Sequence, residues 1–227
     1  MVHGAGGGAW EWLIWQRVFA AAGAQTHAFD LTVHGALETT HYPHYLAQVR
    51  SQIECYQPSV LIGASLGGLL AAEALSIDVG QTNSVRALIL AAPMLKSGTG
   101  IEIAGAKIAG YVKRWAHATE LAKTARALPD ADSAAIAFAH ARWRDESASV
   151  LNTAYAGRDF PSCSRAALML IAEHDRDISN FGLRSWAHTE QMDIQCVRGA
   201  SHAGLLLGQY AAATAELAYC WARTCLN

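Results

Sequence analysis

A serine placed between two glycines, directly after a short apolar run, constrains this chain more than any other feature. The run is Val60-Leu61-Ile62, and the pattern that follows is Gly63-Ala64-Ser65-Leu66-Gly67. This layout is typical of a tight turn between a strand and a helix, because the glycines leave room for the chain to fold back while the serine takes a strained backbone conformation. The turn would expose the Ser65 hydroxyl at a helix N-terminus, where the helix dipole favours developing negative charge.

Short apolar segments alternate with segments of helical periodicity on both sides of this turn. We predict helices over residues 9–22, 44–55, 66–77, 181–188 and 205–226, and strands over residues 26–31, 59–64, 85–91, 167–173 and 192–197. Fully apolar short strands that alternate with helices predict an α/β fold with a mostly parallel sheet and helices on both faces. Since the 227 residues are 52% hydrophobic, which is enough for one substantial core, we expect a single domain over residues 1–227.

The middle of the chain differs from the rest. Residues 94–161 contain no convincing buried strand, only an Ala-rich helical pattern that carries Lys, Arg and Trp. We therefore expect a small helical cap inserted into the α/β domain, and caps of this kind shape pockets and exclude water. The sequence leaves open whether its tryptophans line the entrance or belong to the core, and the four in question are Trp10, Trp12, Trp115 and Trp143.

Composition argues against several classes of partner. The net charge is −2, from 17 basic and 19 acidic residues, and no run of Lys or Arg exceeds two, so we expect no nucleic acid partner. The five cysteines are scattered without a Cys-x-x-Cys pair, as in reduced thiols of a cytoplasmic protein. No secretory signal and no apolar run of membrane-spanning length is present, so we expect no membrane partner, and a homodimer is left open.

Two further side chains would complete a nucleophilic site around Ser65. A serine hydroxyl is a poor nucleophile at neutral pH, so it needs a histidine as general base and a carboxylate that orients the histidine. Asp175 follows the apolar run 168–171, and His202 follows the run 194–197. Both lie at predicted strand ends, so we expect Asp175 and His202 to serve Ser65, with Asp177 as the rival acid.

Such a site also needs backbone amides directed at the oxyanion of a tetrahedral intermediate. One amide would come from Leu66, the residue after the nucleophile. The other would come from the Gly-rich stretch of residues 2–10, where we expect Ala5 to be the donor. We also expect Gly4, Gly6 and Trp10 to contact the substrate, because glycines let the backbone approach a ligand closely.

Three neighbouring histidines, His34, His41 and His44, are the place in the sequence where a metal site could be sought. They have no carboxylate or cysteine partner at ligand spacing, so we interpret them as loop histidines and expect neither a metal nor a cofactor.

Taken together, these motifs resemble those of the α/β-hydrolase superfamily. The opening, residues 3–12, is similar to that of the plant methylesterase and hydroxynitrile lyase group and its bacterial esterase relatives. The resemblance covers residues 1–92 and 165–227. It implies cofactor-free hydrolysis of a small-molecule carboxylic ester, with Ser65 as nucleophile, Asp175 as orienting acid and His202 as base and then acid. It also implies Ala5 and Leu66 as oxyanion donors.

The chain departs from the family pattern in several places. Ala64 stands where the family usually has histidine, Gly7 stands where its plant members usually have histidine, and Ala172 replaces the usual glycine before the acid. These departures weaken any transfer of the plant substrates. The family's first two strands and most of the third would precede His3, so we expect the N-terminal strands to be missing through truncation or a misassigned start. The predicted strands 26–31 and 59–64 would then lack their common neighbour.

Three alternatives remain open at this stage. Gly4, Gly6 and Ala9 also match a dinucleotide-binding turn, followed by a predicted strand that ends in Asp30, although this reading of an oxidoreductase gives Ser65 no role. A hydrolase fold can also serve as a non-catalytic binding protein. Finally, the same three side chains could support hydroxynitrile lyase or haloperoxidase chemistry instead of hydrolysis.

Overall fold

A four-stranded parallel sheet forms the centre of the protein. The structure is a computed structural model that describes residues 1–76, 84–99, 107–115 and 120–226. The strands are β1 (Val60–Ala64), β2 (Ala87–Ala91), β5 (Ala166–Ala172) and β6 (Asp193–Val197), in the order β1-β2-β5-β6. Every residue of β2 is buried, because it lies between two strands and beneath helices on both faces. The mostly parallel sheet predicted from the apolar runs is confirmed.

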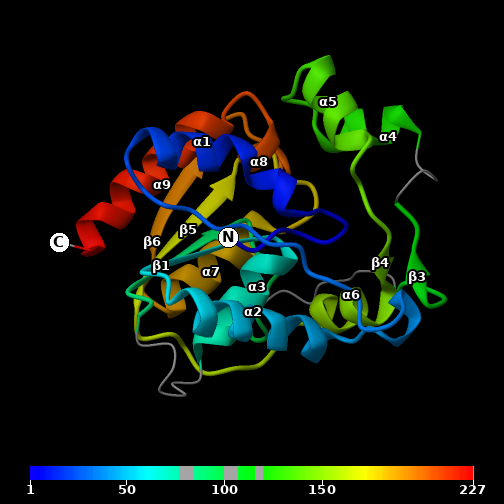
Figure 1. The fold of residues 1–227 in the computed structure, drawn as a ribbon, viewed down its shortest axis with the longest axis horizontal. Coiled ribbons are helices and arrows are strands. Elements are labelled where there is room, and N and C mark those ends of the chain that lie inside the picture. The colour runs from blue at the N-terminus through cyan, green and yellow to red at the C-terminus, as the bar shows by residue number, and fades with distance from the viewer. Residues whose placement is uncertain (77–83, 100–106, 116–119, 227) are drawn as a thin grey trace.

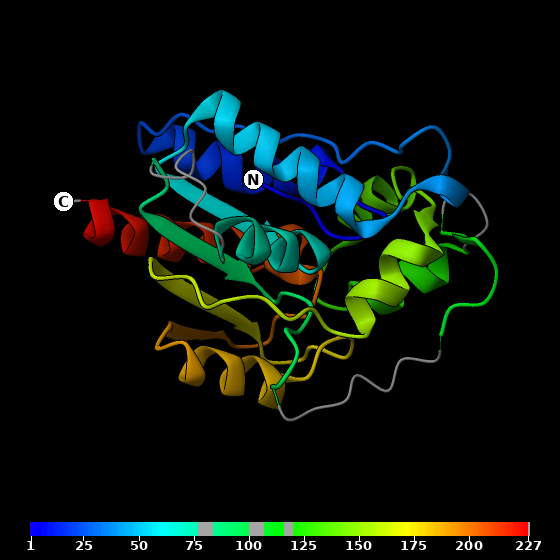
Figure 2. The ribbon, with the colours of Figure 1, turned by 90° about the horizontal axis from the view of Figure 1, so that it is seen from below.

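Helices cover both faces of this sheet, as predicted (Figure 1). One face carries α1 (Leu13–Ala21) and α9 (Ala211–Leu226), and the other carries α2 (Tyr42–Tyr56), α3 (Leu66–Ser76) and α7 (Asn180–Thr189). Figure 2 shows α2 and α3 in front of the strands when the molecule is seen from below. All of α3 except its last residue is buried, because its glycines and alanines let the helix pack closely. The predicted end of this helix, residue 77, lies outside the described residues.

The N-terminal segment adds only a single bridging residue to the sheet. Val2 forms parallel bridges with both Phe29 and Gly63, and its amide donates to Ile62 O at 2.8 Å. The strand predicted over residues 26–31 is wrong, because Phe29 is the one residue of that segment in a bridge and Val2 is its partner. Residues 29 and 63 nevertheless share a neighbour, which is Val2.

Residues 94–161 lie between β2 and β5 and are called the cap segment below; the structure describes residues 94–99, 107–115 and 120–161 of it. It contains α4 (Leu121–Ala127), α5 (Ser133–His140) and α6 (Ala148–Tyr155). Two short strands that were not predicted, β3 (Val112–Lys113) and β4 (Glu146–Ser147), pair antiparallel within it. In Figure 1, α4 and α5 stand apart from the sheet, whereas α6 lies beside α2 and α3.

An ion pair links the C-terminal end of the cap segment to α3. Arg158 donates to Glu73 through two nitrogens, at 2.7 and 3.0 Å, in a bidentate geometry. Glu73 is buried, so this pair supplies the partner that a buried carboxylate requires.

The helical region at the C-terminus is divided into two helices, α8 and α9. A single helix over residues 205–226 was predicted, and that prediction is wrong: α8 (Gly204–Leu207) ends at Gly208, whose backbone is extended. The Trp15 indole donates to Leu205 O at 3.0 Å and so fixes α8 against α1. The remaining short helices are η1 (Ala9–Trp12) and η2 (Leu37–Thr39). Within the described ranges, no helix combines the length and the apolar character that crossing a membrane requires.

Candidate active site

Ser65 occupies the turn between β1 and α3, where its φ of 51° lies in the left-handed region. This conformation is costly for a residue with a Cβ atom, so the surroundings must hold it. The Ser65 amide donates to Ala91 O at 3.1 Å, and its carbonyl accepts the amide of Met94 at 2.9 Å. A Cβ atom on Gly67 would strike the backbone of Val2 and His3, so the second glycine of the motif is required for space.

Asp175 and His202 lie on the loops that follow β5 and β6. His202 Nδ1 is 2.8 Å from Asp175 Oδ2, and the side chain of Asp175 is fully shielded from solvent. The other carboxylate oxygen, Oδ1, accepts the amides of Asp177 and Ile178 at 2.9 Å each. The rival acid Asp177 is exposed, and Asp175 is the carboxylate that bonds the ring.

The electrostatic surroundings favour a protonated His202. Burial by itself lowers the pKa of the imidazole, but the hydrogen bond and negative charge of Asp175 outweigh it, and the charges of Asp177 and Glu11 add to the same effect. The pKa of His202 is therefore raised above its ordinary value.

The loop that carries His202 is attached to the cap segment through Asp130. The hydroxyl of Ser201 donates to Asp130 Oδ1, and the Ser201 amide donates to Oδ2 at 3.2 Å. The Gln209 amide also donates to the Asp130 carbonyl at 2.9 Å. One residue of the cap segment thus holds both ends of the short segment that contains His202 and α8.

Three backbone amides of the Gly-rich turn at the N-terminus, those of Gly4, Gly6 and Gly7, donate hydrogen bonds within the protein. The Gly4 amide donates to Glu11 Oε2 at 3.0 Å, and the Gly6 amide donates to Glu146 Oε2 at 3.2 Å. The Gly7 amide donates to Gly4 O at 3.2 Å. No acceptor among the described residues is assigned to the Ala5 amide, which leaves it available to a ligand.

Arg144, from the cap segment, holds the same turn by its carbonyls. Its amide donates to Gly6 O at 2.7 Å, and its Nε donates to Gly7 O at 2.6 Å. Its guanidinium also lies 3.1 Å from His3 Nε2. Residues of the cap segment, which are distant in the sequence, therefore bind both the amides and the carbonyls of the turn.

His3 is a buried, neutral histidine that stabilises the start of the turn. Its Nε2 accepts the Leu31 amide at 2.9 Å, so Nδ1 carries the proton and donates to Gly4 O at 2.7 Å. Burial, with a smaller contribution from Arg144, lowers the pKa of His3 to about 4. A protonated ring would lose its acceptor atom and with it the bond to Leu31.

Ser65 and His202 open onto one cavity of about 310 Å³, and Ala5 lines it too. The wall is mainly apolar, and the side chains from the cap segment and neighbouring loops include Met94, Trp115, Trp143, Leu151, Tyr155 and Ile178. Lys123 and Asp177 contribute the charged groups of the lining. Such a cavity suits an apolar ligand of modest size.

The other residues predicted to contact substrate, Gly4, Gly6 and Trp10, are not among the described residues that line this cavity. Gly4 lines a smaller chamber of about 70 Å³ that also touches Ser65 and His202. Among the described residues that line the larger cavity, neither Gly6 nor Trp10 is found. Trp10 instead packs edge-to-face on Trp143, with ring centroids 5.2 Å apart, and so supports the wall from behind.

Of the four tryptophans left open by the sequence, two line the cavity and two do not. Trp115 and Trp143 line it, Trp10 supports it, and Trp12 is fully buried in the core.

Metal-ligand atoms come together in one place in the described part of the chain. Asp175, Asp177 and His202 offer such atoms within 4.8 Å of one another, but His202 Nδ1 and Asp175 Oδ2 already bond each other. The rings of His34 and His44 stack at 4.1 Å, and His44 Nδ1 accepts the His41 amide at 3.0 Å. These contacts are structural, and they make no second ligand set among the described residues.

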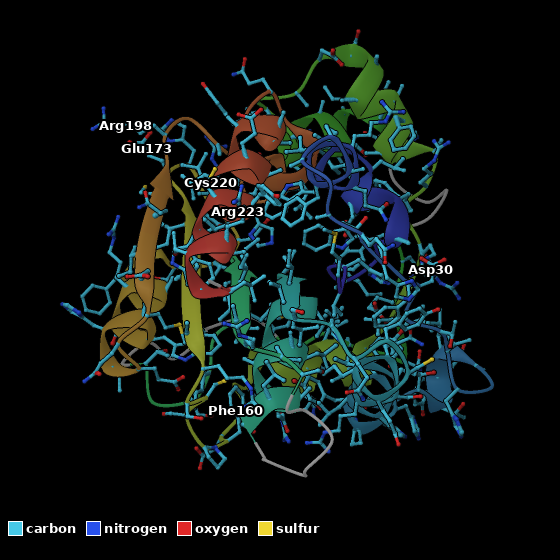
Figure 3. The ribbon with its side chains drawn as sticks, turned by 60° about the vertical axis from the view of Figure 1, so that its left-hand side comes forward. Asp30, Phe160, Glu173, Arg198, Cys220 and Arg223 are labelled. Carbon is cyan, nitrogen blue, oxygen red and sulfur yellow. The ribbon has the colours of Figure 1, made fainter. Side chains whose placement is uncertain are left out.

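Asp30, which a dinucleotide-binding unit would direct to a ribose, has a structural contact instead. Its Oδ1 accepts the Ala9 amide at 2.7 Å and so satisfies the first turn of η1. Figure 3 shows the Asp30 side chain beside the N-terminal ribbon and away from α9, where Cys220 and Arg223 lie.

Sequence reasoning missed Glu11, Asp130, Arg144 and Glu146. Glu11 alone carried a signal, because it is an acidic residue between two tryptophans. The other three belong to the cap segment, and no local pattern connects them with residues 3–7 or 201.

Comparisons with known proteins agree with this architecture. The model of the alpha/beta hydrolase family matches residues 1–217. No curated protein matches the chain. Among solved structures, tomato methylketone synthase I complexed with 2-tridecanone is similar, with a TM-score of 0.72 and 16% identity over 98% of this chain and 96% of that one.

Two further structures share the fold at low identity. An Arabidopsis methylesterase has a TM-score of 0.70 and 14% identity, covering 99% of this chain and 96% of its own. A pyrethroid hydrolase from Sphingobium faniae JZ-2 has a TM-score of 0.71 and 20% identity, covering 98% and 95%. The family match spans nearly the whole chain, and this protein therefore belongs to the alpha/beta hydrolase family.

Proposed function

We propose that this hydrolase cleaves small to medium carboxylic esters through an acyl-enzyme on Ser65. The observation that carries the proposal is that the strained Ser65, the His202 ring and Ala5, whose amide is unengaged, line one cavity, while Asp175 bonds the far side of the ring. These are the parts that acyl transfer requires.

In the first half of the reaction, the Ser65 oxygen attacks the ester carbonyl while His202 takes the hydroxyl proton. Because Nδ1 is engaged by Asp175, Nε2 is the ring nitrogen that accepts this proton. The tetrahedral oxyanion would be bound by the amides of Ala5 and Leu66. His202 then returns the proton to the departing alcohol, which leaves the acyl group on Ser65.

In the second half, water attacks the acyl-enzyme and the same groups act again. His202 accepts a proton from the water, the oxyanion forms in the same place, and the acid is released as Ser65 recovers its proton. No cofactor is needed for either half.

The cavity sets the expected range of substrates. Its volume of about 310 Å³ lies at the lower end for small-molecule sites, and together with its apolar wall it supports an ester with small to medium acyl or alkyl groups. Methylester and pyrethroid hydrolysis by the structural neighbours is consistent with an ester substrate of this kind.

Two measurements test the proposal. A fluorophosphonate probe should label the wild-type protein covalently and should fail to label Ser65→Ala. A series of p-nitrophenyl esters should be hydrolysed with the highest kcat/KM for short acyl chains, and Ser65→Ala should lower kcat by several orders of magnitude, about 10⁴-fold or more. Folded wild-type protein that is neither labelled nor active would instead support a non-catalytic binding protein. Labelling without ester turnover would favour lyase or haloperoxidase chemistry on the same groups.

A further inference from the structure

Glu11 is a buried carboxyl beside the proposed active site that the three-residue mechanism does not use. It is 5% exposed, and it stands in η1 between Trp10 and Trp12. It also lines the chamber of about 70 Å³ whose wall includes Ser65 and His202. A buried acid is costly unless its surroundings give it partners, so its place here calls for a role.

The first partner of Glu11 is the Gly-rich turn. Its Oε2 accepts the Gly4 amide at 3.0 Å, one residue before the amide of Ala5. The carboxyl also fills the space that a side chain on Gly7 would need, since a Cβ atom there would collide with the carboxyl group. The absence of a side chain at Gly7 leaves room for the Glu11 carboxyl, and the hydrogen bond from that carboxyl to Gly4 stabilises the backbone conformation of residues 4–7.

The second partner is the charge of His202. Glu11 and His202 interact electrostatically, and Arg144 is the other charged group that acts on Glu11. His202 in turn faces three carboxyls: Asp175, Asp177 and Glu11. Glu11 and His202 thus share the wall of the small chamber, and Glu11 comes from η1 whereas Asp175 and Asp177 come from the loop after β5.

We propose that Glu11 is a positioning residue of this active site, whose carboxyl fixes the turn that presents the Ala5 amide and faces His202 as an additional acid. The inference rests on the proposed function of Ser65 and His202. It assigns two separable effects to one side chain: a hydrogen bond that needs only an acceptor oxygen, and a charge that needs ionisation.

The two effects predict a definite order of variants. Glu11→Gln keeps an oxygen for the Gly4 amide but removes the charge, whereas Glu11→Ala removes both. Since Glu11 is one of the groups that raise the pKa of His202, Glu11→Gln should lower that pKa. Glu11→Ala should also lower kcat, because a turn that loses its anchor misplaces the oxyanion donor.

The deciding experiment is a pH titration of the His202 ring by NMR on the full-length protein, compared with the pH profile of kcat/KM for p-nitrophenyl acetate. Because burial raises the pKa of Glu11 to about 7, its charge acts on His202 only as the pH approaches that value, so in Glu11→Gln both midpoints should move to lower pH by up to about half a unit relative to wild type. Glu11→Ala should show the same shift together with a kcat about tenfold lower than that of Glu11→Gln. Glu216→Gln, which changes an exposed acid on α9, is the matched control and should leave both midpoints in place.

The outcomes separate this inference from the proposed function. A His202 midpoint that is the same in Glu11→Gln and wild type overturns the inference, and the NMR titration gives this result even if Glu11→Ala does not fold. Equal kcat in Glu11→Ala and Glu11→Gln, with both folded, also overturns it. A wild-type protein without esterase activity would contradict the proposed function, while the NMR titration would still report on Glu11.

Discussion

Asp175 uses both carboxylate oxygens, placing Oδ2 at 2.8 Å from His202 Nδ1 and Oδ1 at 2.9 Å from the amide nitrogens of Asp177 and Ile178. Because both oxygens are engaged, the carboxylate cannot rotate away from the ring without losing backbone bonds. The imidazole is therefore held with Nδ1 toward the acid and Nε2 free for a second partner.

This arrangement predicts which of two neighbouring acids matters. Asp175→Asn should lower kcat by about 10⁴-fold, as the loss of an orienting acid can do, while leaving the fold intact. Asp177→Asn, two residues away and exposed, should stay within about tenfold of wild type, because it does not bond the ring. Steady-state kinetics on one p-nitrophenyl ester compares the two, and a larger loss in Asp177→Asn would reverse the assignment.

The raised pKa of His202 predicts the acid limb of the activity profile. The ring must be neutral to act as a base, so activity should be lost as the pH falls through its pKa, which lies above the ordinary value of 6.5. Asp177→Asn removes one of the charges that raise this pKa and should move the midpoint to lower pH. The profile of kcat/KM from pH 5 to 9 measures both effects. A wild-type midpoint below 6.5 would contradict the assigned surroundings of the ring.

The hydrogen bond between Glu146 of the cap segment and the Gly6 amide predicts that a substitution outside the reacting groups lowers activity. Glu146→Ala would release the Gly6 amide and should lower kcat by about 10²-fold, because small displacements of a catalytic group are that costly. Glu146 also accepts the Tyr45 hydroxyl at 2.8 Å, so Tyr45→Phe serves as the control for that second contact. It should retain most of the activity. Losses of equal size in the two variants would assign the effect to packing rather than to the turn.

The Glu11 carboxyl predicts a pH-dependent effect on stability. Burial raises the pKa of Glu11 from 4.5 to about 7, so the folded protein binds a proton that the unfolded chain releases between these values. The group therefore costs the folded state stability as the pH rises through this window. Glu11→Gln should raise the free energy of unfolding above pH 7 by up to about 3 kcal/mol, and the difference should vanish below pH 4.5. Urea unfolding at pH 4 and pH 8 measures this difference in the free energy of unfolding. A variant that is as stable as wild type or less stable at both pH values would contradict the raised pKa of Glu11.

The close contact of Gly67 with the backbone of Val2 and His3 predicts that adding one methyl group there lowers stability. Gly67→Ala would push its new methyl group into the backbone of Val2 and His3, and it should destabilise the protein by about 1–3 kcal/mol. It should also lower activity, since those residues lead into the turn that carries Ala5. Thermal melts and probe labelling measure the two effects. A Gly67→Ala protein with unchanged stability and labelling would show that the turn has room to spare.

The parts of this protein that the sequence predicted are those with a local signature. Apolar runs identified β1, β2, β5 and β6, and the residues at their ends identified Ser65, Asp175 and His202 as candidates. The strand expected at residues 26–31 failed because a strand depends on its neighbour, and Val2 alone pairs there. The helix expected over residues 205–226 failed because an extended Gly208 carries no strong signal in an apolar, helix-like stretch.

What could not be predicted depends on contacts between distant segments. Glu146 and Arg144 meet the turn near the N-terminus through tertiary packing of the cap segment, and neither belongs to a motif. Asp130 likewise contacts Ser201 across 71 residues. Such pairs follow from how the elements pack, which residue spacing alone does not specify.

The contact of Gly6 with Glu146 also has a consequence for how activity arises during folding. Gly6 precedes Glu146 by 140 residues, so a chain whose cap segment has not yet packed against the turn lacks this anchor even though Glu11 is present. Ser65, Asp175 and His202 could all be present in such a molecule without the oxyanion donor in place. Covalent labelling of Ser65 would then count the molecules in which the cap segment has packed against the turn.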